Sequence, residues 1–207
     1  MTEPAMTEPG PAFFDVVLGQ RAHRALRPDP VPEGLVEQVI EAATHAPSAE
    51  NRQPWAFIVV RDETARSTIA QLTARAWEGV GREWSRPSLA PRLFAEVDTW
   101  ATTGLAAAPV HIVVCGDTHL SPVELLAPSI YPAVQNLLLA ALAVGLGSLL
   151  STLALTSGQP LRDLLGLPDH IVPMALVPLG YPARALGPPR RHAMAERTHR
   201  ERWGRPW

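Results

Sequence analysis

The apolar positions of the chain follow two patterns, one of helical period and one typical of buried strands. Helical spacing predicts helices over 13–19, 32–47, 62–77, 93–101, 128–144 and 160–165. Continuous apolar runs bounded by turn residues predict strands over 56–60, 110–115 and 171–179. The pattern therefore predicts a mixed fold, with helices and strands following each other along the chain.

Glycine and proline refine these boundaries. Asp62 is a suitable N-cap for the helix that follows it, and Gly145 is expected to end the long helix. Pro173 and Pro178 interrupt the last strand, so that strand should lie at a sheet edge or carry a bulge. The segment 77–91 is rich in glycine and proline and is predicted to be irregular.

We expect a single domain over 13–207, because the chain has no internal repeat and no clean linker. Residues 1–12 have acidic residues and prolines without an apolar core, which predicts a disordered tail rather than a signal peptide. The polar, proline-bearing end of the chain from Arg184 keeps Trp203 and Trp207. We expect this arm to wrap a surface, which could be that of a partner subunit.

Composition narrows the class of protein. Hydrophobic residues make up 46% and charged residues 18% of the chain, as in a globular protein. The net charge of −2 argues against a general nucleic-acid binder. All 18 basic residues are arginines, so any anion site must use guanidinium groups.

The apolar run around the long helix raises the question of a membrane span. No charged residue occurs over 125–161, which is long enough to cross a bilayer. Gly145 and Gly147 interrupt the run, and no basic cluster flanks it. A buried core helix is the favoured interpretation, with no membrane partner and a cytoplasmic location.

Several familiar sites are missing from the sequence. The stretch "GLGSLL" follows a helix and lacks the third glycine of a dinucleotide fingerprint. The seven histidines show no metal-ligand spacing, so no metal site is predicted. Cys115 lies in an apolar run, which favours a buried inert thiol over a nucleophile.

One loop is unusually rich in side chains that can bind a ligand. In "THAPSAENRQPWAFIVV", Ser48, Asn51 and Gln53 lie between Pro47 and Pro54. Two arginine groups, one near Arg21 and one near Arg190, could hold a phosphate, while amide and hydroxyl groups contact a flat polar ring. FMN has this shape, although composition alone supports it only weakly.

Four stretches resemble the nitroreductase family of FMN-dependent enzymes in their residues, order and spacing. These are "QRAHRALRPDPVP", "EAATHAPSAENRQPWAFIVV", "YPAVQNLLLAALAVGLGS" and "VPLGYPA". The resemblance implies an α+β fold with a mostly antiparallel central sheet flanked by helices. It also implies an obligate homodimer, with two FMN molecules in the interface and a C-terminal arm that reaches the partner.

The resemblance also assigns candidate cofactor-binding residues. They are Arg21, Ala22, His23, Arg24, Pro47, Ser48, Asn51, Leu150, Ser151, Thr152, Arg190 and Arg191. The family usually has R-R-S-x-R where this chain has Gln20 to Arg24, so one arginine and the serine are missing. Gln53 and Trp55 are expected to hold the loop on the next strand instead.

The family implies a ping-pong reaction in which NADH or NADPH gives a hydride to flavin N5. A nitroaromatic, a quinone or a similar conjugated acceptor then takes two electrons, and no protein residue is expected to be catalytic. Flavin fragmentation and reductive dehalogenation on the same fold are alternatives, as is a flavin-binding protein without turnover. Trp77, Trp84 and Trp100 could form a substrate lid, but packing is the favoured role.

Overall fold

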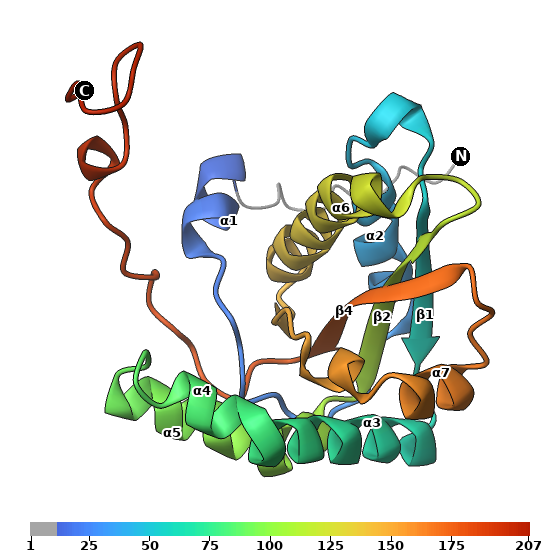
Figure 1. Ribbon diagram of the computed structural model, residues 1–207. Coiled ribbons are helices and arrows are strands. Elements are labelled where there is room, and N and C mark those ends of the chain that lie inside the picture. Colours follow the sequence, from blue (N-terminus) through green and yellow to red (C-terminus); the bar gives the residue numbers. More distant parts are fainter. Residues whose placement is uncertain (1–11) are drawn as a thin grey trace, which may run out of the picture.

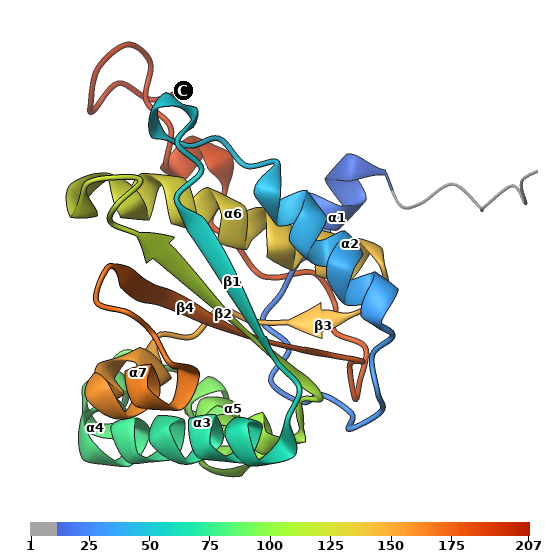
Figure 2. The ribbon, with the colours of Figure 1, turned by 90° about the vertical axis from the view of Figure 1, so that its right-hand side faces the viewer.

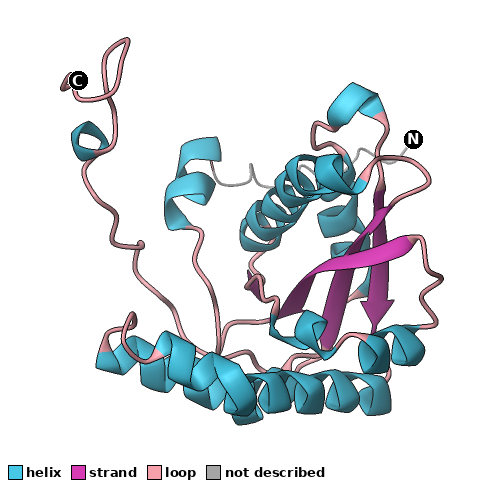
Figure 3. Cartoon of the chain, in the orientation of Figure 1, coloured by secondary structure: helices cyan, strands magenta, loops and turns pink. Residues whose placement is uncertain are grey.

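The computed structural model describes residues 12–207 (Figures 1 and 3). The predicted disordered tail therefore lies outside the described residues, except for Ala12. The α-helices of the described residues are α1 (Phe13–Gly19), α2 (Glu33–Thr44), α3 (Glu63–Ala76), α4 (Arg82–Ser85), α5 (Pro91–Thr99), α6 (Val123–Ala143) and α7 (Gln159–Leu165). The strands are β1 (Trp55–Val60), β2 (Val110–Asp117), β3 (Gly147–Ser148) and β4 (Ile171–Gly180).

The four strands form one antiparallel sheet in the order β1-β2-β4-β3. Helices cover both faces: α1, α2 and α6 lie on one side, and α3, α4, α5 and α7 on the other (Figure 2). Because side chains alternate along a strand, Ile112 and Val114 pack under α2 and α6, while Val113 and Cys115 join the core beneath α3. The predicted α+β class with an antiparallel sheet is confirmed.

Strand β4 shows how a proline-bearing strand enters a sheet. Its partner register on β2 steps from Val114↔Ala175 to Cys115↔Pro173, which leaves Met174 unpaired as a bulge. The bulge was one of the two predicted alternatives. The other alternative, an edge position, holds only in part: β3 pairs with β4 at Leu179 and Gly180, whereas around Pro173 the described strands pair with β4 on the β2 side alone.

Helix α6 begins earlier than the sequence predicted. It starts at Val123 and contains both Pro128 and Pro132, although each proline removes one backbone hydrogen bond. Burial of Leu126 and Ile130 among the core residues compensates for those lost bonds. A local pattern with proline therefore predicts too late a start for this helix, because it carries no information about tertiary packing.

Two predicted helix boundaries are confirmed. The side chain of Asp62 accepts a hydrogen bond of 2.8 Å from the backbone N–H of Ala65 at the start of α3. At the end of α6, Gly145 has φ 78°. The N–H of Gly145 donates to Leu142 O (3.0 Å) and that of Leu146 to Ala141 O (2.8 Å), which is a Schellman motif.

Within the described residues, α6 is long and apolar enough by itself to cross a membrane. It packs instead against α2 and the sheet, and eight of its residues are buried. In this fold α6 is therefore a core helix, as predicted.

The prediction of an irregular segment over 77–91 is wrong for 77–85, which is helical, and is confirmed for 86–90. Trp77–Gly81 forms a π-helical turn that continues α3 and leads into α4. Trp77 and Trp100 are buried in the core between α3 and the sheet, so packing is confirmed for these two. Trp84, by contrast, is exposed. Gly79 and Gly81 suggested a loop, but helical neighbours and burial of Trp77 outweigh their low helix propensity.

Candidate functional site

The arginine-bearing segment after α1 lies beside β3. Ala22 and Ser148 form a parallel bridge, and the N–H of His23 donates to Ser148 O at 3.0 Å. A Cβ on Gly147 would lie 2.9 Å from the Cβ of His23, so glycine allows this close approach. Two stretches that are more than a hundred residues apart thus form one wall.

This wall borders a cavity of about 440 Å³, within the range of roughly 300–1,000 Å³ typical of small-molecule sites. Its other sides are α5 and the start of the C-terminal arm. The lining includes Ala22, His23 and Arg24 from the predicted site. The remaining lining residues are Ala25, Arg92, Ala95, Glu96, Thr99, Trp100, Arg184 and Leu186.

Three of the four charged side chains that line the cavity form ion pairs with one another, and the fourth, Arg24, does not. Glu96 pairs with Arg184 (2.9 Å) and Arg92 (3.5 Å), and the hydrogen bond from Arg184 is the main reason why the pKa of Glu96 is lowered. Arg24 forms no hydrogen bond or ion pair of its side chain within residues 12–207. Burial is the main cause that lowers the pKa of Arg24, so its guanidinium is a partly desolvated donor without a protein acceptor.

His23 differs from its neighbours because its side chain is buried. Its pKa is lowered, first by burial and second by the nearby charge of Arg21. A neutral imidazole can lie against the cavity wall without adding to the positive charge there.

The segment Leu150–Thr152 continues from β3. Ser151 exchanges two backbone hydrogen bonds with Leu176 (2.9 and 2.8 Å), which fixes the segment on the sheet. Leu150 is 40% exposed, and Thr152 is exposed as well. The structure thus places two exposed residues, Leu150 and Thr152, shortly after the strand that pairs with the arginine segment, where a flat ring could lie.

The loop between α2 and β1 is held in a strained conformation. Glu50, Asn51 and Gln53 all have positive φ values, of 52°, 55° and 49°. Ser48 Oγ accepts a hydrogen bond from the N–H of Gln53 (3.0 Å), and Ser129 Oγ accepts one from the N–H of Ala49 (3.1 Å). Left-handed backbone at non-glycine residues costs free energy and is concentrated at functional sites.

The roles within this loop differ in part from the sequence interpretation. Ser48 uses its hydroxyl oxygen to close the loop, while Asn51 is exposed and accepts from Gln53 Nε2 at 3.1 Å. Pro47 is exposed beside them. Asn51 therefore remains available to a ligand with its amide N–H₂, while Ser48 holds the shape.

The loop and the arginine segment lie at opposite ends of the sheet. Asp117, the last residue of β2, donates its N–H to Pro54 O, whereas Val110 at the other end pairs with Leu179 beside β3. A strand of this length spans roughly 23 Å. One chain therefore does not bring its own loop to its own cavity.

Arg190 and Arg191 lie further along the arm, away from the cavity. Both are exposed and line a shallow hollow of about 270 Å³ with His192. Figure 1 shows the arm extending from the body of the molecule beyond α1. The arm is anchored near its start, where Arg21 Nη1 donates to Gly187 O at 2.6 Å.

The sequence interpretation missed the contribution of α5 to the cavity. Arg92 and Glu96 are spaced by one helical turn on its surface, which by itself is typical of a solvated helix. Only the folded chain brings them opposite Arg24 and Arg184.

Comparison with known proteins identifies the family. The Nitroreductase family model matches residues 17–181, so the chain belongs to that family. A Methanothermobacter thermautotrophicus protein whose name joins NADH dehydrogenase and NAD(P)H nitroreductase is 30% identical over 202 residues, covering 92% of this chain and 87% of its own.

A second group of relatives carries a different name. Iodotyrosine deiodinase 1 of Rattus norvegicus is 29% identical over 188 residues, or 86% of this chain, and the chain spans 64% of its length. A crystal structure of oxidized iodotyrosine deiodinase bound to FMN and 3-iodo-L-tyrosine has the same fold, with a TM-score of 0.71 and 24% identity over 88% of this chain and 97% of that one. The chain thus belongs to a family of oxidoreductases, and its fold is also that of a protein whose crystal structure contains FMN.

Proposed function

We propose that the protein is an FMN-dependent oxidoreductase that uses NADH or NADPH to reduce a nitroaromatic, a quinone or a similar conjugated acceptor. The observation that carries this proposal is Arg24, a partly desolvated guanidinium without a protein acceptor in a cavity of net positive charge. A phosphate or a ring carbonyl would supply the missing acceptor. The names of the relatives support the same class of reaction.

The residues present fit FMN. Arg24 on the cavity wall supplies donors for the phosphate and ribityl end, with the charge of Arg21 nearby. The exposed residues Leu150 and Thr152 supply a surface for the ring. When bound, FMN supplies two-electron chemistry, taking a hydride from the nicotinamide and passing the electrons to the acceptor. The protein orients both reactants and limits the access of water, so we assign no catalytic residue.

The active unit in this proposal is a homodimer whose sites are shared between subunits. The loop of Ser48 and Asn51 of one copy would reach the cavity of the other, since the two lie at opposite ends of each sheet. Exposed apolar residues support such an interface: Phe13, Phe14 and Leu18 on α1 are 68%, 71% and 66% exposed. The arm, with Trp203 at 89% exposure, would cover the partner and bring Arg190 and Arg191 to its phosphate.

The test is to load the purified chain with FMN and to screen acceptors with both nicotinamides. We expect a yellow protein that oxidises NADH or NADPH when a nitroaromatic or a quinone is present. A chain that takes up no FMN contradicts the proposal, and one that binds FMN without turnover by either nicotinamide favours the non-catalytic alternative. Light scattering on the loaded protein reports whether it is a dimer.

Reductive dehalogenation is the second candidate, because several relatives are named iodotyrosine deiodinase. Anaerobic incubation of the reduced, FMN-loaded protein with 3-iodotyrosine, followed by iodide measurement, tests it. Product analysis after aerobic incubation of reduced FMN tests flavin fragmentation in the same preparation. Rapid iodide release with slow nitroaromatic turnover would favour the second candidate over the first.

A further inference from the structure

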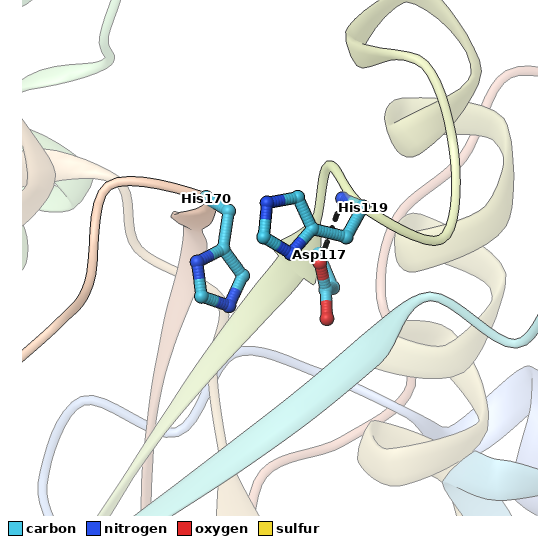
Figure 4. Close-up of side chains that lie close together, drawn as sticks. All are labelled: Asp117, His119 and His170. Carbon is cyan, nitrogen blue, oxygen red and sulfur yellow. Dashed lines mark hydrogen bonds between the residues drawn. The ribbon is translucent and has the colours of Figure 1, made fainter.

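Three side chains outside the flavin site converge at the far end of the sheet. We propose that Asp117, His119 and His170 bind a divalent transition-metal ion of the Zn²⁺ type. One ligand atom from each of the three side chains lies within 4.8 Å of the other two (Figure 4). Two imidazoles and one carboxylate form a donor set that Zn²⁺ commonly uses.

The convergence comes from two turns that are distant in sequence. Asp117 ends β2 and His119 follows in the turn that leads to α6, while His170 stands directly before β4. The spacing of more than fifty residues explains why no metal-ligand pattern is visible in the sequence. The antiparallel pairing of Asp117 with Ile171 brings the two turns together.

Backbone contacts hold the two turns in place. Thr118 donates to His170 O from both its N–H (2.9 Å) and its Oγ1 (3.1 Å). Asp117 Oδ1 also accepts a hydrogen bond of 2.8 Å from the N–H of His119. The backbone is therefore already fixed, and only side chains need to move on binding, which lowers the entropic cost.

The two imidazoles are neighbours, but one of them must reorient before both can bind one ion, because the nitrogen lone pairs lie in the planes of the stacked rings. Their rings are stacked, with centroids 4.0 Å apart and an interplanar angle of 7°. Tetrahedral zinc with ligand distances of about 2.1 Å needs donor atoms roughly 3.4 Å apart. Rotation of the exposed His119 side chain can close the difference, and water completes the coordination.

The bound ion would tie three segments to one another. Besides the two turns, Asp117 is joined to the end of the loop between α2 and β1, because its N–H donates to Pro54 O at 2.7 Å. We therefore expect Zn²⁺ to raise the thermal stability of the FMN-loaded protein. Mg²⁺, which prefers oxygen ligands, should not have this effect at equal concentration.

The experiment is calorimetric titration of the purified, tag-free protein with Zn²⁺, in parallel with thermal unfolding, both with and without added FMN. We expect one Zn²⁺ per chain and a rise in melting temperature. His119→Ala and His170→Ala should each weaken binding at least tenfold. The matched control is His45→Ala, which removes another exposed histidine beside a carboxylate, Glu41, at 3.9 Å, and should leave binding unchanged.

Equal Zn²⁺ affinity in wild type and both cluster variants would overturn the proposal, and so would the absence of any binding to wild type. The result is independent of the flavin proposal. His119 is exposed and outside the cavity, so His119→Ala should keep its FMN content and turnover while losing the metal. A wild-type protein that binds Zn²⁺ but takes up no FMN would contradict only the proposed function.

Discussion

Arg24 is the residue whose surroundings most clearly indicate a ligand-binding site, since its half-buried guanidinium has no acceptor among the described residues. We expect Arg24→Ala to weaken FMN binding about 10- to 100-fold, because a charge-assisted hydrogen bond contributes roughly 1.5–3 kcal/mol. Titration of the apoprotein with FMN, followed by flavin fluorescence, measures this. Arg27→Ala is the matched control, because Arg27 pairs with Asp29 at 3.5 Å outside the cavity. Equal weakening in both variants would contradict a specific role.

Asp98 joins the π-helical turn to α5. It accepts hydrogen bonds from Trp77 Nε1 (2.7 Å) and Arg82 Nη2 (2.9 Å), and these bonds, the one from Trp77 first, lower its pKa. Asp98→Ala should lower the free energy of unfolding by about 1–3 kcal/mol, because the indole N–H loses its acceptor. Urea unfolding measures the loss. Asp29→Ala, an exposed ion-pair partner, should cost less than about 1 kcal/mol.

At the scale of elements, the close approach of β3 to the arginine segment depends on Gly147. In Gly147→Ala, the new Cβ would lie 2.9 Å from both His23 Cβ and Leu26 Cδ2, so the segment must shift. We expect a loss of about 1–3 kcal/mol in unfolding free energy together with weaker FMN binding. Gly34→Ala on α2 meets no atom within 4 Å and should be neutral or stabilising. An unchanged FMN affinity in Gly147→Ala would show that this close packing does not shape the FMN site.

Strand β2 carries a buried histidine that should make the fold sensitive to acid. Burial lowers the pKa of His111 from 6.5 to about 4, although the carbonyl of Leu105 accepts a hydrogen bond from its ring. The unfolded chain then binds a proton that the folded chain does not. Stability should fall as the pH drops from 6.5 towards 4, by on the order of 3 kcal/mol.

Urea unfolding between pH 7 and pH 4.5 measures this loss. His111→Phe should flatten the slope, with His45→Ala as the control for the loss of one histidine. A slope unchanged by His111→Phe would assign the acid sensitivity to other groups.

Local patterns predicted the elements where local and tertiary preferences agree. Asp62 and Gly145 mark helix ends by backbone geometry that their own residue types favour. The patterns were wrong over 77–85 and before Pro128, where glycine and proline suggested breaks. Burial of Trp77 and of Leu126 outweighs those breaks, and burial depends on residues far along the chain.

For the whole molecule, the shared site can be tested by mixing two defective variants. Arg24→Ala and the double variant Ser48→Ala/Asn51→Ala should each lose activity. After unfolding and refolding together with FMN, random pairing should restore about a quarter of the wild-type sites, because one site of each mixed dimer receives only intact residues. Turnover per chain measures the recovery. No recovery, with native mass spectrometry showing mixed dimers, would place both elements in the same subunit's site.

The sequence by itself determined the family motifs, the chemistry of the candidate side chains and most elements, because these depend on residue type and short-range spacing. Only the tertiary structure decided which of these residues meet. It joined Arg24 to α5, placed the Ser48 loop at the other end of the sheet, and brought His119 to His170. Such encounters depend on the register of β2 with β1 and β4, which is set by the burial of side chains on both faces of the sheet.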